Sequence, residues 1–178
     1  MSESPLNTFL VSVEARAYRM AKLATRDEDE ALDIVQDAMM KLARHYSDRD
    51  PEQWRPLFFR ILQNRIMDRH RREAVRRRWF CWRTDRLAEE PDSVSDPGDE
   101  GSSDPEAALV GERMSETLLT EIEAMPVRQQ QCFLLRYWEG LSVQQTADIM
   151  KLDTGSVKTH SHRALRKLNQ VIEQHSHG

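Results

Sequence analysis

Several side chains near the end of the sequence have the types and spacing of a DNA-reading helix. Lys158, Thr159, His162 and Arg163 share one side of a helix, because residues three and four apart are neighbours on a helical surface. Lysine and arginine can donate hydrogen bonds to guanine, and a neutral imidazole can donate or accept one bond at a base edge. Ser156 lies just before them. His162 has a plainer interpretation as a surface or partly packed histidine.

The segment that must position these residues is "LSVQQTADIMKLDTGSVKTHSHRALRKL", which is typical of two helices joined by a tight corner. Ser142 can cap the first helix, with Gln145 as its capping-box partner. Asp153 can cap the second helix through its carboxylate. Lys151 occupies the corner position where glycine is usual. A left-handed conformation there costs about 1 kcal/mol relative to glycine, which a packed corner can absorb.

The apolar residues of this segment fall on one face of each expected helix. The first face is Val143, Ala147 and Met150, and the second is Val157, Ala164, Leu165 and Leu168. Ala147 is small, as a second helix crossing close above it requires. The pattern predicts a helix-turn-helix, whose second helix enters the major groove of DNA.

A second basic region lies earlier in the chain. Residues 55–78 contain nine arginines against only Asp68 and Glu73, which makes this expected helix a candidate surface for a polyanion. A solvated helix face is the alternative. Aromatic side chains near the start of the helix could stack on unpaired bases or could pack in a core. These are Trp54, Phe58 and Phe59, and core packing is the preferred interpretation for Phe58.

The remaining periodicity is helical throughout, so the fold class is expected to be all-α. The charge is sorted into blocks: residues 80–112 hold two basic residues against ten acidic ones, and this stretch is rich in Ser, Pro and Gly. Such a composition predicts a flexible linker. We therefore expect two small helical domains, residues 1–80 and 107–178, joined by an acidic linker at 81–106, with the helix-turn-helix in the second.

The composition also argues against several classes of protein. Cys81 and Cys132 stand alone without ligand spacing and are expected to be reduced thiols in a cytoplasmic protein. No signal peptide and no apolar run of about 20 residues is present, so no membrane insertion is expected. The common enzyme motifs are missing, and we expect neither catalysis nor a cofactor. His175 and His177 form a terminal His-x-His that is better explained as a solvated tail than as a metal site.

The segment "MPVRQQQCFLLRYWEGLSVQQTADIMKLDTGSVKTHSHRALRKL" resembles the promoter −35 domain of bacterial extracytoplasmic-function (ECF) sigma factors, in the sigma-70 family. The matching stretches are Met125-Pro126, Phe133 to Tyr137, Gly140 to Ser142, Gly155 to Thr159, and His162 to Ala164. Three positions depart from the family pattern. Lys151 replaces a glycine, His160 replaces an arginine, and Ser161 replaces an apolar residue on the inner face.

The first half of the chain carries the family's other motifs. "EALDIVQDAMMKLARHY" is similar to the helix that docks on the polymerase clamp, which implies that core RNA polymerase binds at Asp33, Gln36, Asp37 and Met40. "LFFRILQNRIMDRHRR" is similar to the strand-melting helix, with Asn64 and Asp68 in the family's spacing. This resemblance implies that the single-stranded −10 element is contacted by Arg60, Asn64, Asp68, Arg71 and Arg72.

The resemblance implies a sigma factor that binds core RNA polymerase and directs it to promoters. The duplex −35 element would be read by Ser156, Lys158, Thr159, His162 and Arg163. An anti-sigma factor, which the family often has, is a further implied partner. The alternative from another class is a stand-alone helix-turn-helix regulator that binds duplex operator DNA. That alternative leaves the motifs of the first half unexplained.

Overall fold

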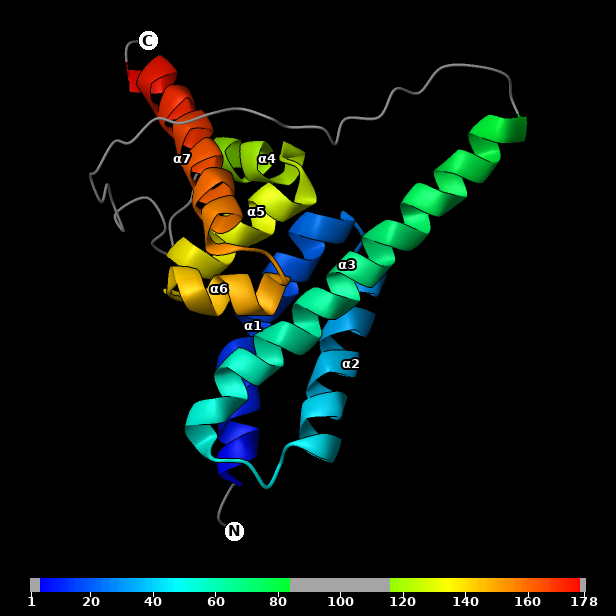
Figure 1. Cartoon of the computed structure of the whole chain (residues 1–178), viewed down its shortest axis with the longest axis vertical. Coiled ribbons are helices and arrows are strands. Elements are labelled where there is room, and N and C mark those ends of the chain that lie inside the picture. Colours follow the sequence, from blue (N-terminus) through cyan, green and yellow to red (C-terminus); the bar gives the residue numbers. More distant parts are fainter. Residues whose placement is uncertain (1–3, 84–115, 177–178) are drawn as a thin grey trace.

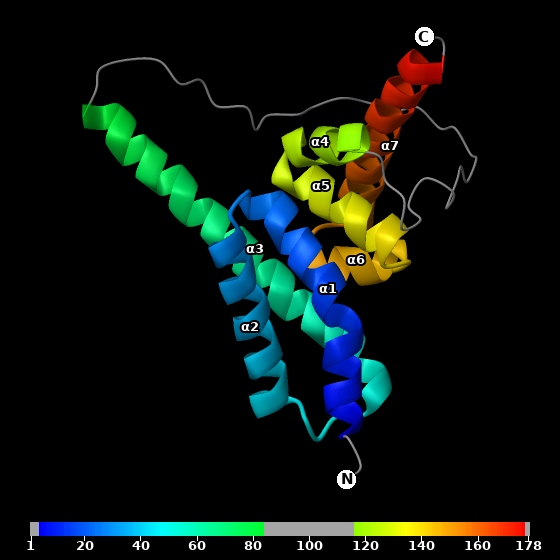
Figure 2. The same ribbon diagram turned by 180° about the vertical axis from the view of Figure 1, so that it is seen from behind.

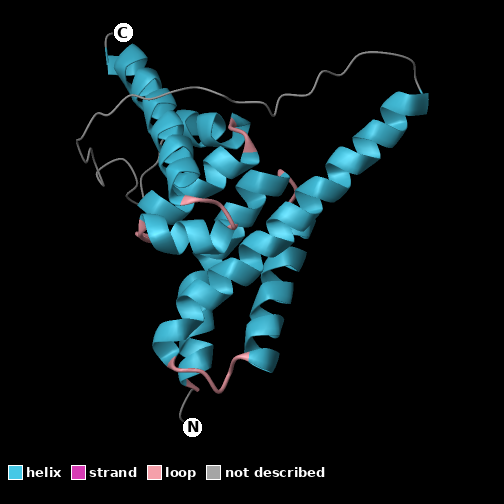
Figure 3. Cartoon of the chain, viewed as in Figure 1, coloured by secondary structure: helices cyan, strands magenta, loops and turns pink. Residues whose placement is uncertain are grey.

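The computed structural model describes residues 4–83 and 116–176, and every regular element in these ranges is a helix (Figures 1 and 3). The elements are α1 (Pro5–Thr25), α2 (Glu28–His45), α3 (Pro51–Arg83), α4 (Glu116–Ala124), α5 (Val127–Phe133), the π-helical turn η2 (Leu134–Trp138), α6 (Val143–Met150) and α7 (Thr154–Ser176). The all-α prediction is confirmed. We call α1–α3 the N-terminal unit and α4–α7 the C-terminal unit.

In the N-terminal unit, α1, α2 and α3 run up, down and up (Figure 1). The turn from α1 to α2 uses Arg26, whose left-handed conformation (φ 57°) ends α1. Asp27 then caps α2, its carboxylate accepting the backbone N–H of Glu30 at 2.9 Å. Acidic residues fill the first turn of α2, where the helix dipole favours negative charge. The apolar residues of α1 and α2 are buried where these helices pack on each other and on α3.

Helix α3 is longer than the sequence pattern indicated, since it begins at Pro51 and continues to Arg83. Pro56 lies inside the helix, about one and a half turns from its start. The loop that leads into α3 is correspondingly short, residues 46–50. The first half of α3 is packed, whereas its second half projects away from the body of the molecule (Figure 1). Val75, Trp79 and Phe80 on that second half are exposed.

The C-terminal unit is built around α5, whose residues from Gln129 to Phe133 are all buried. The chain passes through η2 and turns at Gly140, where φ is +67° and a side chain would be strained. Helices α6 and α7 follow and pack on each other, and α7 also packs on α5 and α6 on η2. Helix α4 begins at Glu116, and residues 107–115 of the predicted second domain lie outside the described range. The predicted acidic linker also lies almost wholly outside it.

The two units pack directly against each other, a feature that the sequence pattern did not reveal. Helix α3 lies on α6, and α1 lies on α4 and α5, an arrangement seen from both sides in Figures 1 and 2. Buried apolar residues of both units belong to one contiguous cluster that includes Met20 and Phe59 from the first and Phe133 and Leu165 from the second. Among the described helices, none combines the length and apolar character that a membrane crossing requires.

Candidate nucleic-acid and protein interfaces

The corner between α6 and α7 has the geometry that the sequence predicts. Ser142 accepts the backbone N–H of Gln145 at 3.0 Å, and the Gln145 side chain accepts the Ser142 N–H at 2.9 Å, which completes a capping box. Lys151 takes the left-handed conformation (φ 56°, ψ 45°) at the end of α6. At the corner itself, the backbone N–H groups of Lys151 and Leu152 both bond to the Ala147 carbonyl, so α6 ends through local bonds.

Asp153 caps α7 as expected, and it also engages Ser156. Its carboxylate accepts the Ser156 backbone N–H and the Ser156 hydroxyl, both at 2.7 Å. These bonds stabilise the ionised form, so the side-chain and then the backbone bond from Ser156 hold the pKa of Asp153 below its usual value. The hydroxyl of Ser156 is therefore committed to the cap, and a base contact from it would require the hydroxyl to rotate away.

The outward face of α7 carries the other predicted base-reading residues. Lys158, Thr159 and His162 are exposed and Arg163 is half-buried, while the intervening Val157 is buried on the inner face. Within the described part of the chain, no salt bridge occupies Lys158 or Arg163. Four donor-bearing side chains therefore stand together on one side of a capped helix, in an arrangement that can enter a major groove.

Ser161, which departs from the apolar pattern, is on the inner face of α7 and is only 3% exposed. Its hydroxyl has no hydrogen-bond partner among the residues that the structure describes. An unsatisfied buried hydroxyl costs roughly 1–3 kcal/mol, so this position lowers the stability of the unit that presents the recognition face.

On α3, the predicted strand-contacting residues also share a face. Arg60, Asn64, Asp68 and Arg71 follow one another at steps of three or four. Arg60 and Arg71 are exposed, and Asn64 and Asp68 are half-buried. Asp68 is engaged within the helix, since its carboxylate pairs with Arg71 at 3.2 Å. Its carbonyl accepts a bond from Arg72, 3.4 Å away. This face therefore mixes positive charge with one amide and one carboxylate.

The aromatic residues near the start of α3 do not belong to this face. Trp54 is 5% exposed and Phe58 and Phe59 are fully buried, so none of them can stack on a base in this structure. The Trp54 indole donates to the Tyr46 carbonyl at 2.9 Å. Phe9 of α1 contacts the rings of both Trp54 and Phe58. The core interpretation of the aromatics is confirmed, and the stacking interpretation is wrong, because α1 covers that side of α3.

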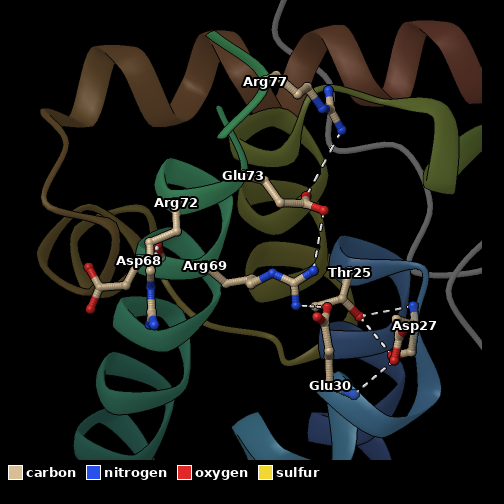
Figure 4. Close-up of polar contacts among 8 residues, drawn as sticks. All are labelled: Thr25, Asp27, Glu30, Asp68, Arg69, Arg72, Glu73 and Arg77. Atoms are coloured by element: carbon tan, nitrogen blue, oxygen red, sulfur yellow. Dashed lines mark hydrogen bonds and ion pairs between the residues drawn. The ribbon is translucent and has the colours of Figure 1, made fainter. Parts of the chain in front are cut away.

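A groove between α2 and α3 was not anticipated from the sequence. It encloses about 420 Å³ and is lined by acidic residues of α2 and by arginines of α3. Arg69 pairs with Glu30 of α2 and with Glu73 one turn further along α3, and Glu73 reaches Arg77 (Figure 4). Arginines at positions 65, 69, 72 and 76 recur at helical spacing, and this pattern was the available signal for the groove.

The predicted polymerase-binding residues lie on an exposed face of α2, and Asp33 and Asp37 of this face also line the groove toward α3. Asp33, Gln36, Asp37 and Met40 are all exposed, and Met40 retains 48% of its accessible surface. Leu32 beside them is similarly exposed. Asp37 also faces α3, where Arg65 lies 3.7 Å from its carboxylate. The face therefore combines acidic and amide groups with two exposed apolar side chains, which suits a protein partner better than a nucleic acid.

The described residues offer nothing that would hold a metal ion, because no group of three or more histidine, cysteine or acidic side chains comes together in them. Cys132 is fully buried, and burial raises the pKa of its thiol to about 12, which suppresses nucleophilic chemistry.

Comparisons with known proteins agree with both motif sets. A family model described as sigma-70 region 2 matches residues 8–76, and one described as sigma-70 region 4 matches residues 115–168. The chain is 28% identical over 157 residues to an RNA polymerase sigma-E factor of Streptomyces avermitilis, covering 87% of this chain and 78% of the relative. It is 27% identical over 151 residues to the RNA polymerase sigma factor SigV of Bacillus subtilis, covering 84% and 80%.

Two further matches extend this result. An ECF RNA polymerase sigma factor, SigE of Mycolicibacterium smegmatis, is 25% identical over 161 residues, which cover 90% of this chain and 59% of the relative. Among solved structures, the sigma factor RpoE in complex with the anti-sigma factor NepR from Bartonella quintana superimposes with a TM-score of 0.62 at 21% identity. That superposition covers 94% of this chain and 96% of the other, so the likeness in fold extends over both units.

Proposed function

The chain belongs to the sigma-70 family as an RNA polymerase sigma factor of the ECF type, and from this premise we propose which surfaces carry its function. The exposed face of α2 with Asp33, Gln36, Asp37 and Met40 binds core RNA polymerase. Exposed apolar side chains next to carboxylates support this assignment, because they give a partner both area to bury and a charge pattern to recognise.

Promoter DNA is contacted by two separate surfaces in this proposal. Helix α7 reads the duplex −35 element with Lys158, Thr159, His162 and Arg163, and with Ser156 once its hydroxyl leaves Asp153. Helix α3 holds the unpaired strand of the −10 element with Arg60, Asn64, Asp68, Arg71 and Arg72. The division is supported by chemistry: α7 offers donors suited to base edges, whereas α3 offers a dense row of arginines around one amide.

The observation that carries the proposal is the presence of both surfaces, in order, on one chain. A stand-alone operator-binding regulator needs only the helix-turn-helix, and it would leave α2 and α3 without a role. The match to sigma-70 region 2 and the names of the relatives argue against that alternative.

The remaining parts of the proposal follow from this role. The chemistry of RNA synthesis belongs to the polymerase, and this chain acts in the cytoplasm as its specificity subunit without a cofactor of its own. A sigma factor of similar fold was solved with an anti-sigma factor, and we extend that kind of partner to this chain as well.

The deciding experiment mixes the purified chain with core RNA polymerase. Co-elution and promoter-dependent run-off transcripts are expected from the wild type. Asp33→Arg is expected to weaken co-elution without loss of helical content, whereas Glu14→Arg, a charge reversal on the exposed side of α1, serves as the matched control. Tight binding of the chain alone to duplex operator DNA, with no polymerase binding, would favour the regulator instead.

A further inference from the structure

The face of α3 that carries the proposed strand contacts continues beyond Arg71. A helix turns by about 100° per residue, so positions three or four apart share a side. Asn64, Asp68 and Arg71 are spaced in this way. Two further steps of four along the same side reach Val75 and then Trp79. Both residues belong to the half of α3 that projects from the body of the molecule (Figure 1).

The two added side chains are apolar, and both are exposed. Trp79 is 71% exposed and Val75 is 54% exposed. Within residues 4–83 and 116–176, no hydrogen bond or ring contact engages the Trp79 indole. A single exposed apolar residue is common in soluble proteins and needs no explanation. Here, however, two such residues lie one turn apart in line with a polar binding face, which indicates that a ligand covers them.

Arginines lie beside this apolar pair. Arg72 and Arg76 are on the side toward α2, where they line the groove, and both are exposed. Along the strand face itself, the carboxylate of Asp68 is offset by Arg71 at 3.2 Å. Figure 4 shows Asp68 and Arg69 pointing to different sides of α3, so the strand face and the groove are separate surfaces. The charge around the apolar pair is therefore positive, which favours an anionic ligand.

An exposed indole among arginines is suited to unpaired bases. Proteins hold single strands by combining a cationic surface for the phosphates with aromatic rings on which bases stack. A duplex does not offer its base faces to such a ring, because they are stacked inside it. An acidic protein would also match the charge. The continuity of this face with Asn64, which is placed on the unpaired strand, favours a single strand of nucleic acid.

We propose that Trp79 is a further strand-binding residue, whose indole stacks on an unpaired base of the opened promoter. The inference rests on the proposed sigma-factor function and extends the strand-holding surface of α3 by about two turns. Trp79 supplies the aromatic contact that the buried Trp54, Phe58 and Phe59 cannot provide. Val75, one turn before it, adds an apolar contact beside the same base.

The position of this base along the strand is limited by the length of the helix. Trp79 comes 15 residues after Asn64, which is about 22 Å at 1.5 Å per residue. Stacked nucleotides repeat every 3.4 Å along a strand, and an unstacked strand is more extended. The base bound by Trp79 therefore lies at most about seven nucleotides from the one contacted by Asn64. The two side chains contact different nucleotides of one strand.

The test uses variants of Trp79 in the holoenzyme formed with core RNA polymerase. Trp79→Ala removes the ring, Trp79→Phe keeps an aromatic face, and Trp79→Leu keeps an apolar side chain without one. Phe80→Ala is the matched control, because Phe80 is the adjacent aromatic residue, is similarly exposed at 72%, and lies about 100° further round the helix. Circular dichroism checks that each variant keeps the helical content of the wild type.

The affinity of each holoenzyme is measured for two promoter probes. One probe is fully duplex, and in the other the non-template strand is unpaired through the −10 element and its flanking nucleotides. Affinity for the unpaired probe should fall about tenfold in Trp79→Ala, because one stacked base is lost. Trp79→Leu should resemble Trp79→Ala, and Trp79→Phe should retain much of the affinity. Binding of the duplex probe and of core polymerase should not change, and Phe80→Ala should match the wild type.

An abasic scan of the unpaired strand then locates the base. Removal of the stacked base should weaken wild-type binding about tenfold but have little further effect on Trp79→Ala, because both changes remove the same contact. The same scan on Asn64→Ala should identify a different nucleotide, within about seven positions of the first.

The outcomes separate this inference from the proposed function. The stacking role would be overturned if Trp79→Ala or Trp79→Leu bound the unpaired probe like the wild type, or if no abasic position were coupled to Trp79. Loss of core-polymerase binding in Trp79→Ala would also overturn it, because the side chain would then contact the polymerase. Each of these results would leave the sigma-factor function standing. A wild-type chain that gives no promoter-dependent transcript with core polymerase would overturn the function itself.

Discussion

On α7, Lys158 and His162 are exposed, and within the described ranges no acidic side chain pairs with Lys158 or Arg163. On α3, in contrast, Arg69 is held between Glu30 and Glu73, and Asp68 pairs with Arg71. On α7, Lys158 and Arg163 thus have no acidic partner within the described ranges, whereas α3 presents arginines that are paired with carboxylates. A surface for duplex DNA can present unpaired lysine and arginine side chains, because the duplex is rigid and its shape is constant. A surface for a single strand needs arginines in defined positions, and carboxylates beside them reduce non-specific binding to duplex DNA.

The largest expected effect comes from removing the free donors of α7. Lys158→Ala and Arg163→Ala should each weaken use of a −35-dependent promoter by roughly 1–3 kcal/mol if the side chain contacts a base. Scanning base substitutions through the −35 element with wild type and variants measures this loss. A phosphate contact would instead weaken all sequences alike and flatten the salt dependence. Full activity of both variants would contradict the recognition role of α7.

On α3, the corresponding test is Asn64→Ala. We expect closed-complex formation with the polymerase to be nearly unchanged and strand opening to slow by about tenfold, or roughly 1.4 kcal/mol in the barrier. A fluorescent base analogue in the −10 element reports opening directly. Gln53→Ala removes an exposed amide at the other end of α3 and serves as the control. Opening at the wild-type rate would remove Asn64 from the strand-holding surface.

Ser161→Ala tests whether the buried Ser161 hydroxyl lowers the stability of the C-terminal unit, which carries α7. The substitution removes a buried hydroxyl that lacks a partner among the described residues, so unfolding of the chain should require about 1 kcal/mol more. Chemical denaturation followed by circular dichroism measures the difference. Base preference at the −35 element should not change, because Ser161 is buried on the inner face of α7, away from the proposed base-reading residues. A destabilised variant would mean that the hydroxyl is satisfied, for example by water.

Lys151→Gly should also raise the free energy of unfolding, but by less than Ser161→Ala. Glycine takes the left-handed conformation without steric cost, although its unfolded state is more flexible, so a net gain of about 0.5–1 kcal/mol is expected. Thermal unfolding of the two proteins compares them, and promoter binding checks that α7 leaves the corner at an unchanged angle. Equal stabilities would show that the packed corner already offsets the conformational cost at Lys151.

Glu73→Gln gives the smallest expected effect and addresses the carboxylates of α3. Stability should fall by only about 0.2–1 kcal/mol, as for other partly exposed ion pairs. Non-specific DNA binding should strengthen slightly, and the slope of log K against log salt should steepen by up to about one unit, since Arg69 and Arg77 lose a shared neutralising partner. An unchanged slope would indicate that Glu30 alone neutralises Arg69.

The parts of this fold that could be predicted from the sequence are the local ones. The capping box of Ser142 and Gln145, the left-handed Lys151 and the Asp153 cap each depend on residues within three or four positions. The apolar faces of α1, α2 and α7 follow from periodicity. Because the apolar residues of α7 define its inner face, the candidate base-reading side chains could be placed on its outer face.

What could not be predicted depends on partners far along the chain. Gln63 and Gln131 look like ordinary surface residues, because nothing local distinguishes a solvated glutamine from one that bonds across a domain contact. The burial of Trp54 and Phe59 required knowing that α1 covers that side of α3. No sequence pattern predicted the π-helical turn at residues 134–138. The ion pairs of Glu139 could not be predicted either, because its partners Arg16 and Arg55 lie in two other helices.

The continuity of α3 has a mechanical consequence. Gln63 sits within the same unbroken helix as the projecting end at Arg83, about 30 Å further along at 1.5 Å per residue. A stiff rod pivoted near one point amplifies small rotations, so a tilt of about 10° at Gln63 would move the far end by roughly 5 Å over that length. Helix α3 would then work as a lever arm: a change in how the two units meet would displace Trp79 and the neighbouring arginines bodily, with no rearrangement of side chains in between.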